Sequence, residues 1–320
     1  MSNDRVSRMP ILQGTAMVGL TVWLAAVTGA AEPVAGTSQL PVLGFRQEPH
    51  PTHEFLNYVW ATFPEVPGLT CDAWCYESEV DYIDHRALDG GRMELRHRLR
   101  GQPQVIFVTT VTPEPGAVEF SARPVLDPSQ AGGGKIPANL PGLNLCFQLR
   151  RAEGFSSRPN QYPEFVGRNF IFTEKGRTFL LDTNRRKILH RFPADDPKNN
   201  PPWVQAYVGA WMPVPEVQGR GWAEASTDRY AIPVIGVVSR DGKHLVAIAN
   251  GSADSLCNAW HDCVHNNPKW LPADAPPQER RWRLKVYAMP NDPEALLARV
   301  NHDFPEAAKL RTPETWRDYR

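Results

Sequence analysis

Short segments in which apolar and polar residues alternate do most to limit how this chain can fold. Between residues 93 and 100, Met93, Leu95 and Leu99 alternate with charged residues, which predicts a strand with one face on a core and one in water. Prolines and glycines, 31 and 23 of them, supply turns between such segments. Further strands are predicted at 105–111, 117–122, 144–149, 169–172, 178–181, 232–238, 244–249 and 282–286. The chain is therefore expected to be mainly β.

The clearest hairpin is centred on Asp241-Gly242, between the predicted strands 232–238 and 244–249. An Asp-Gly pair supplies the positive φ that a tight hairpin turn requires. Neighbouring strands joined by such turns run antiparallel, and the sequence has no repeat at the spacing of a propeller or a solenoid. We therefore expect a large antiparallel β-sandwich, supersandwich or jelly-roll-like, as a single domain over residues 51–320.

Two helices are predicted beside the strands. The first covers 52–63, with Thr52 as its cap, and is expected to lie on the surface as a lid. The second covers 293–304, with Asp292 as its cap and Pro293 at the first helical position, and is expected to pack on an outer sheet face. The apolar residues at helical spacing are Phe55, Leu56, Val59, Trp60 and Phe63 in the first helix and Leu296, Leu297, Val300 and Phe304 in the second.

The N-terminal residues have the order of a secretory signal. Arg5 and Arg8 precede an apolar run from Ile11 to Val27, and small residues follow at 28–31. We expect residues 1–31 to be a signal peptide, 32–50 to be an extended lead-in, and the mature protein to be secreted or periplasmic without stable membrane insertion. The alternative is an uncleaved membrane helix, because the apolar run falls only slightly short of about 20 residues.

Charge gives no reason to expect a polyanionic partner. Lys plus Arg and Asp plus Glu number 35 each, so a broad positive field for nucleic acid is absent from the composition. The densest basic stretch, between Arg92 and Arg100, alternates with apolar residues and is interpreted as the solvated face of a strand.

Five cysteines in a chain that is expected to be exported predict two disulfides and one leftover thiol. The simplest pairing joins Cys71 to Cys75 and Cys257 to Cys263, and it buries Cys146 between apolar neighbours. Pairing does not follow from the sequence alone, so Cys71 or Cys75 bonded to Cys146 or to the later pair is an open alternative.

The segment 257–267 holds the densest set of reactive side chains. It is predicted to be a loop closed by the Cys257–Cys263 bridge, with His261 and His265 as candidate acid/base catalysts. Two alternatives stay open. The histidines and Asp262 form a divalent metal site, or the loop is a stapled surface turn whose histidines bond neighbouring backbone.

Tryptophans in predicted loops suggest a sugar-binding surface. An indole face packs against the C–H groups of a sugar ring, and polar neighbours bond its hydroxyls. Trp211 and Trp260 are the candidate platforms, Asn266 a polar neighbour, and Arg168 a candidate anchor for an anionic sugar.

Several segments together resemble the galactose-mutarotase-like supersandwich, over about residues 90–290. They are the strand 144–149 (NLCFQL), the hairpin 239–242 (SRDG), the segment 263–268 (CVHNNP) and the closing strand 283–287 (RLKVY). The resemblance implies two large facing sheets and a sugar bound at a concave sheet face. It assigns no reaction to particular residues.

These observations lead to a carbohydrate-active protein as the functional hypothesis, a sugar lyase or epimerase that uses histidine acid/base chemistry, with a carbohydrate ligand and no cofactor. No phosphate-binding loop, dinucleotide fingerprint or serine-hydrolase elbow is present in the sequence. The alternatives are a non-catalytic carbohydrate-binding or envelope-associated module and a metal-dependent hydrolase.

Overall fold

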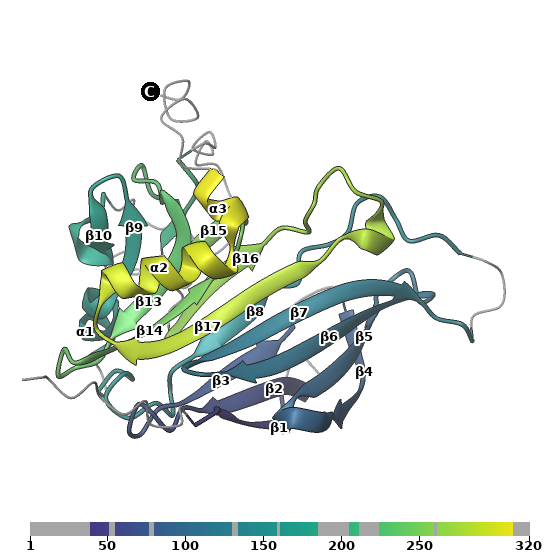
Figure 1. Cartoon of the computed structure of the whole chain (residues 1–320), viewed down its shortest axis with the longest axis horizontal. Coiled ribbons are helices and arrows are strands. Elements are labelled where there is room, and N and C mark those ends of the chain that lie inside the picture. The colour runs from purple at the N-terminus through teal and green to yellow at the C-terminus, as the bar shows by residue number, and fades with distance from the viewer. Residues whose placement is uncertain are drawn as a thin grey trace, which may run out of the picture. The chain divides into compact units, whose positions relative to one another are not determined.

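The computed structural model describes residues 39–50, 55–76, 80–129, 134–158, 161–184, 205–210, 224–258 and 261–309. All of them belong to one compact unit, Thr37–Arg320. Two large β-sheets form this unit, with a few short helices at their edges and on one outer face (Figure 1). The predicted class, a mainly β antiparallel sandwich, is confirmed.

The first sheet has eight strands among the described residues, and its neighbours are antiparallel except for β11 and β12. In order across the sheet they are β1 (Val42–Pro49), β2 (Phe55–Thr62), β3 (Thr70–Cys75), β8 (Leu145–Gln148), β16 (Cys263–Pro268), β15 (Ala253–Asn258), β11 (Gln205–Tyr207) and β12 (Glu224–Ala225). Strands from the first half of the chain meet strands from the second half between β8 and β16. That junction is formed by only three residue pairs.

The second sheet has nine antiparallel strands among the described residues. In order they are β10 (Gly176–Phe179), β9 (Asn169–Thr173), β13 (Ile232–Val238), β14 (His244–Ala249), β17 (Trp282–Pro290), β7 (Ala117–Leu126), β6 (Val105–Glu114), β5 (Met93–Leu99) and β4 (Val80–Ala87). The short helices are η1 (Asp89–Gly91), α1 (Tyr162–Arg168), η2 (Leu180–Asp182), η4 (Pro277–Glu279), α2 (Pro293–Asp303) and α3 (Pro305–Lys309).

The main core lies between the two sheets. Phe147 and Val264 enter it from the eight-stranded sheet, and Phe107 and Val286 enter it from the nine-stranded sheet; each is at most 1% exposed. Burying such side chains stabilises the fold by roughly 1.5–3 kcal/mol each, relative to leaving them in water. The inner faces of the two sheets are thus occupied by hydrophobic packing, which leaves the outer faces for other roles.

The local sequence signals in the nine-stranded sheet are confirmed. In β5 the residues at odd positions from Met93 to Leu99 are buried and those between them are half-buried, as the alternation predicts. Gly242 has φ of 73° in the turn between β13 and β14. Helix α2 begins at Pro293, as the cap signals predict. The Asp292 carboxylate caps it by accepting hydrogen bonds from the backbone N–H of Glu294 and Ala295.

Helices α2 and α3 cover the outer face of the nine-stranded sheet, over β13, β14 and β17 (Figure 1). Leu296, Val300 and Phe304 are fully buried there against Ala247 and Tyr287. The predicted packing of this helix on an outer sheet face is confirmed.

The predicted helix over 52–63 is wrong. Residues 55–62 form β2, which pairs with β1 on one side and with β3 on the other. Side chains on both faces of β2 are buried, including Tyr58 and Val59. The strand therefore lacks the period-2 alternation that would have identified it. The segment 42–49, expected to be part of an extended lead-in, forms the edge strand β1.

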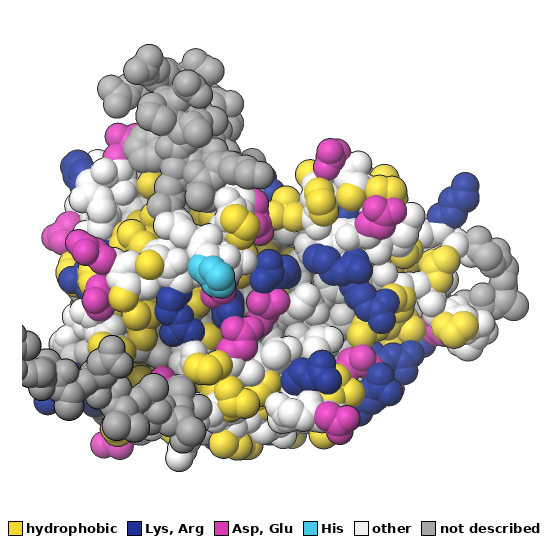
Figure 2. Space-filling model, in the orientation of Figure 1, with side chains coloured by type: hydrophobic (Ala, Val, Ile, Leu, Met, Phe, Trp, Pro, Cys, Tyr) yellow, Lys and Arg dark blue, Asp and Glu magenta, His cyan; other side chains and the backbone are white. Residues whose placement is uncertain are grey.

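Charged side chains of both signs are interspersed on the side of the molecule drawn in Figure 2. The two arginines of β5, and Arg100 directly after it, have acidic partners: Arg96 pairs with Asp84, Arg98 with Asp127 and Arg100 with Asp81. This pairing agrees with the interpretation of the basic stretch as a solvated strand face.

Residues 1–31, the expected signal peptide, lie outside the described residues. None of the helices that the structure describes is both long and apolar enough to cross a membrane.

Candidate metal centre

Within the segment 257–267, residues 257–258 end strand β15 and residues 263–267 belong to strand β16, and no disulfide joins Cys257 to Cys263. Strands β15 and β16 pair side by side, with Cys257 opposite His265 and Asn258 opposite Val264. Successive side chains of a strand point to opposite faces of the sheet. Cys263 and His265 therefore share one face, while Val264 between them points into the core.

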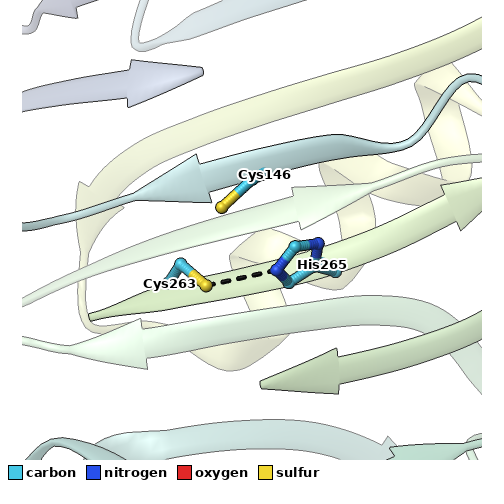
Figure 3. A group of neighbouring side chains, drawn as sticks. All are labelled: Cys146, Cys263 and His265. Atoms are coloured by element: carbon cyan, nitrogen blue, oxygen red, sulfur yellow. Dashed lines mark hydrogen bonds between the residues drawn. The ribbon is translucent and has the colours of Figure 1, made fainter. Parts of the chain in front are cut away.

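Strand β8 brings a third side chain to the same face. In the pairing of β8 with β16, Cys146 lies opposite His265, and Cys263 lies opposite Gln148. Phe147, between Cys146 and Gln148, enters the core. Figure 3 shows Cys146 on β8 and Cys263 and His265 on β16, with their side chains gathered between the two strands.

One potential ligand atom from each of Cys146, Cys263 and His265 lies within 4.8 Å of the other two. Cys263 Sγ is 3.2 Å from His265 Nε2. His261 lies at the edge of this group, with its Nε2 atom 3.5 Å from Cys263 Sγ and 4.0 Å from Cys146 Sγ. Both thiols are fully buried and His265 is 4% exposed, whereas His261 is half-buried.

The neighbours of the group fix its position and change its protonation. Trp74 packs against the two thiols, and Gln148 Nε2 donates a hydrogen bond to Cys146 Sγ over 3.4 Å. Burial by itself raises the pKa of the Cys146 thiol. A hydrogen bond with Cys263, the charge of His265 and a hydrogen bond with His261 outweigh burial, and together they hold that pKa well below its usual value. The arrangement thus favours a thiolate at Cys146.

None of the predicted disulfides is supported, because all five cysteines are thiols in this structure. Cys71 and Cys75 lie four residues apart on the single strand β3, so roughly 13 Å of extended chain separates them. That separation is about twice the Cα distance that a disulfide spans. Both side chains belong to the inter-sheet core, and burial raises the pKa of each thiol far above its usual value.

The second predicted bridge, Cys257–Cys263, is excluded by the strand register. Cys257 lies opposite His265, two residues along β16 from Cys263. The diagonal between such positions is about 8 Å, from strands about 4.8 Å apart and a rise of about 3.3 Å per residue, and it exceeds the Cα distance of a disulfide. The predicted burial of Cys146 is confirmed.

Asp262, the acidic residue of the predicted metal alternative, has a structural role. Its carboxylate accepts a hydrogen bond from the backbone N–H of Ser157 over 2.7 Å, and its carbonyl accepts one from Leu149 N–H over 2.7 Å. These bonds hold the turn before β16 against the segment that follows β8. The candidate ligands beside His265 are therefore the thiols of Cys146 and Cys263, and not the carboxylate of Asp262.

The two predicted sugar-binding residues that the structure describes, Asn266 and Arg168, make their contacts away from the histidines. Asn266 points away from His265, since its amide nitrogen donates to the carbonyls of Pro233 and Ile248. Trp211 and Trp260 lie outside the described residues.

The side chain of Arg168, at the end of α1, has structural contacts. Its guanidinium forms an ion pair with Glu164 and donates hydrogen bonds to the carbonyls of Val238 and Phe155. Those contacts leave it 14% exposed and account for its position without a ligand.

Sequence reasoning missed Cys146 and Cys263 as members of the site. The alternation of Cys263, Val264 and His265 is a period-2 signal that would have placed the thiol and the imidazole on one strand face. No comparable signal connects Cys146, which lies 115 residues before His261. A comparison of the sequence with protein-family models and with curated proteins found no match in either set.

Proposed function

We propose that this protein binds one thiophilic transition metal ion, Zn²⁺ in the first instance, through Cys146, Cys263 and His265. The observation that carries the proposal is the convergence of three ligand atoms within 4.8 Å on one sheet face. The three residues come from strands that are neighbours in space and distant in sequence, so the fold itself assembles the site.

The donor atoms favour this class of metal. Thiolate and imidazole ligands suit zinc and copper(I), whereas Mg²⁺ and Ca²⁺ prefer oxygen ligands. In a tetrahedral zinc site, sulfur and nitrogen ligands lie about 3.6 Å apart, as follows from metal–ligand distances of about 2.3 and 2.0–2.1 Å. The 3.2 Å between Cys263 Sγ and His265 Nε2 requires a movement of only a few tenths of an ångström.

The surroundings supply outer contacts for such an ion. Metal ligands in proteins are commonly oriented by a second set of hydrogen bonds and by an apolar shell. Gln148 donates to the sulfur of Cys146, and Trp74 covers both sulfurs. Strand-borne ligands lose little freedom when an ion binds, which favours tight binding.

The carbohydrate-active role stays a prediction from the sequence. His265 is a candidate in the carbohydrate-active hypothesis, in the metal-dependent alternative and in the present proposal. The thiols of Cys146 and Cys263 are ligands in the present proposal only. Secretion and a carbohydrate partner are likewise predictions, which measurements on the exported protein and glycan binding would test.

Metal titration of the full chain tests the proposal. The protein is purified under reducing conditions, stripped with a chelator and titrated with Zn²⁺ in competition with a chromophoric chelator. One ion is expected to bind per chain, and Co²⁺ is expected to give a sulfur-to-cobalt charge-transfer band. Cys146→Ser and Cys263→Ser should each halve that band and weaken Zn²⁺ binding at least tenfold.

The matched control is Cys71→Ala, which removes a buried thiol from the opposite face of the same sheet. This variant should bind Zn²⁺ and Co²⁺ as the wild type does. Substoichiometric binding by the folded wild type, or unchanged binding by both serine variants, would overturn the proposal.

A further inference from the structure

Three protein ligands leave one position of a four-coordinate ion to be filled. Among the described residues, the imidazole of His261 is a further ligand-type side chain beside both thiols, since its Nε2 atom lies 3.5 Å from Cys263 Sγ and 4.0 Å from Cys146 Sγ. These two distances lie on either side of the value of about 3.6 Å between sulfur and nitrogen ligands of a tetrahedral zinc ion. The ring is therefore at ligand distance from both sulfurs, but it lies outside the group of three atoms within 4.8 Å of one another, so it must move toward His265 when an ion binds.

The backbone on the C-terminal side of His261 is held in place. Asp262 is bonded through its carboxylate to Ser157 and through its carbonyl to Leu149. Cys263, one residue further along, begins β16. Both neighbours of His261 on that side are thus attached to the body of the protein, which keeps the imidazole beside the thiols.

The two thiols are the polar partners of the His261 ring within the described part of the chain. Its Nδ1 atom is buried and has no hydrogen-bond partner there. A polar ring atom without a partner costs free energy when buried, and a favourable interaction elsewhere on the ring would offset that cost. A metal ion bound at Nε2 would supply that interaction.

We infer that His261 Nε2 is the fourth ligand, so that the ion is bound by two sulfurs and two nitrogens, from Cys146, Cys263, His261 and His265. This inference rests on the proposed metal-binding function and specifies its coordination. Binding of Zn²⁺ forms four metal–ligand bonds and releases the remaining thiol protons to the solvent. With four protein ligands the ion has no open position for water or substrate, which is the property of a structural zinc site.

Cobalt substitution separates the inference from the proposal on which it rests. In the Co²⁺-loaded wild type, azide should leave the visible d–d spectrum unchanged because every position is occupied. His261→Ala should still bind Co²⁺ with an undiminished sulfur charge-transfer band, but azide should alter its d–d spectrum. Zn²⁺ affinity should fall by more than the 10- to 100-fold that loss of an outer-shell partner typically costs.

Two further variants complete the test. His261→Cys should restore a closed site and add sulfur charge transfer, which a merely structural role of the ring would not produce. His302→Ala, on helix α2 and away from the cluster, should behave as the wild type. If His261→Ala keeps both the wild-type spectrum and the wild-type affinity, the fourth-ligand inference fails while the three-ligand proposal stands. If the wild type binds no Co²⁺, the proposed function itself fails.

Discussion

Lys285 provides a severe test of how charge stabilises this sandwich. It lies on β17 with a side chain only 4% exposed, and its Nζ atom bonds Glu114 Oε2 over 2.6 Å and Asp303 Oδ2 over 2.8 Å. Lys285→Met keeps most of the aliphatic volume and removes the ammonium group. The two carboxylates would then face each other without a cation between them.

The expected loss follows from the burial of the partners. Removing one member of a buried ion pair costs about 3–5 kcal/mol, because the remaining charge is left uncompensated. Glu114 is 37% exposed and is partly screened by water, whereas Asp303 is 16% exposed. Asp303 also keeps the hydrogen bond that Tyr287 donates to it. We therefore expect a decrease of about 3 kcal/mol in the free energy of unfolding at pH 7, measured by urea denaturation.

The loss should depend on pH in a defined direction. Burial raises the pKa of Asp303, but hydrogen bonds from Lys285 and Tyr287 and the charge of Lys285 outweigh it, so the pKa lies below its ordinary value. A carboxyl group with a lowered pKa stabilises the folded state above its unfolded pKa of about 3.9, and this contribution disappears as the pH falls through the folded pKa. The difference between wild type and variant should therefore be complete at pH 7 and shrink below about pH 4.

The control is Lys243→Met, since Lys243 is 75% exposed and 4.0 Å from Asp241. Its effect should stay within about 0.5 kcal/mol. An effect of that small size for Lys285→Met, or an equal loss at pH 7 and pH 3, would refute the reasoning.

Three other expectations follow from contacts described above. Asp292→Ala removes the cap of α2 and should cost about 1 kcal/mol in urea denaturation; an unchanged midpoint would contradict the capping role. Phe304→Ala opens a cavity under the helices and should cost about 3–5 kcal/mol, whereas a loss below about 1 kcal/mol would show that the outer cluster is loosely packed. Cys71 and Cys75, buried thiols with raised pKa values, should resist alkylation at pH 8 in the native protein and react after denaturation, as mass spectrometry can establish; rapid native labelling would disprove their burial.

The parts of the fold that the sequence predicts are those with local causes. The alternation around Leu95 needs only neighbouring residues to be recognised, as do the Asp241-Gly242 turn and the Asp292 cap. Strand β2 lacks such a cause, because Tyr58 and Val59 are buried on opposite faces. Its apolar residues therefore also fit a helical period, and only its pairing with β1 and β3 decides the outcome.

The candidate metal centre shows the same limit more sharply. The sequence makes His261 and His265 candidates because they are close together; in the structure His265 belongs to the three-residue group and His261 lies at its edge. Asp262 was grouped with them for the same reason, yet hydrogen bonds to Ser157 and Leu149 draw it elsewhere. Cys146 is brought to the site by the pairing of β8 with β16. This contact is long-range, so the spacing of residues in the sequence does not predict it.

The position of the cluster at the junction between β8 and β16 affects how firmly the two halves of the sheet are joined. Three residue pairs there join the two halves of the eight-stranded sheet, and the same pairs carry Cys146, Cys263 and His265. An ion held by both strands would cross-link chain segments separated by more than a hundred positions. Restricting so long a loop lowers the entropy of the unfolded chain. The site would then reinforce a junction of three residue pairs, and loading with metal would strengthen the connection between the two halves of the sheet.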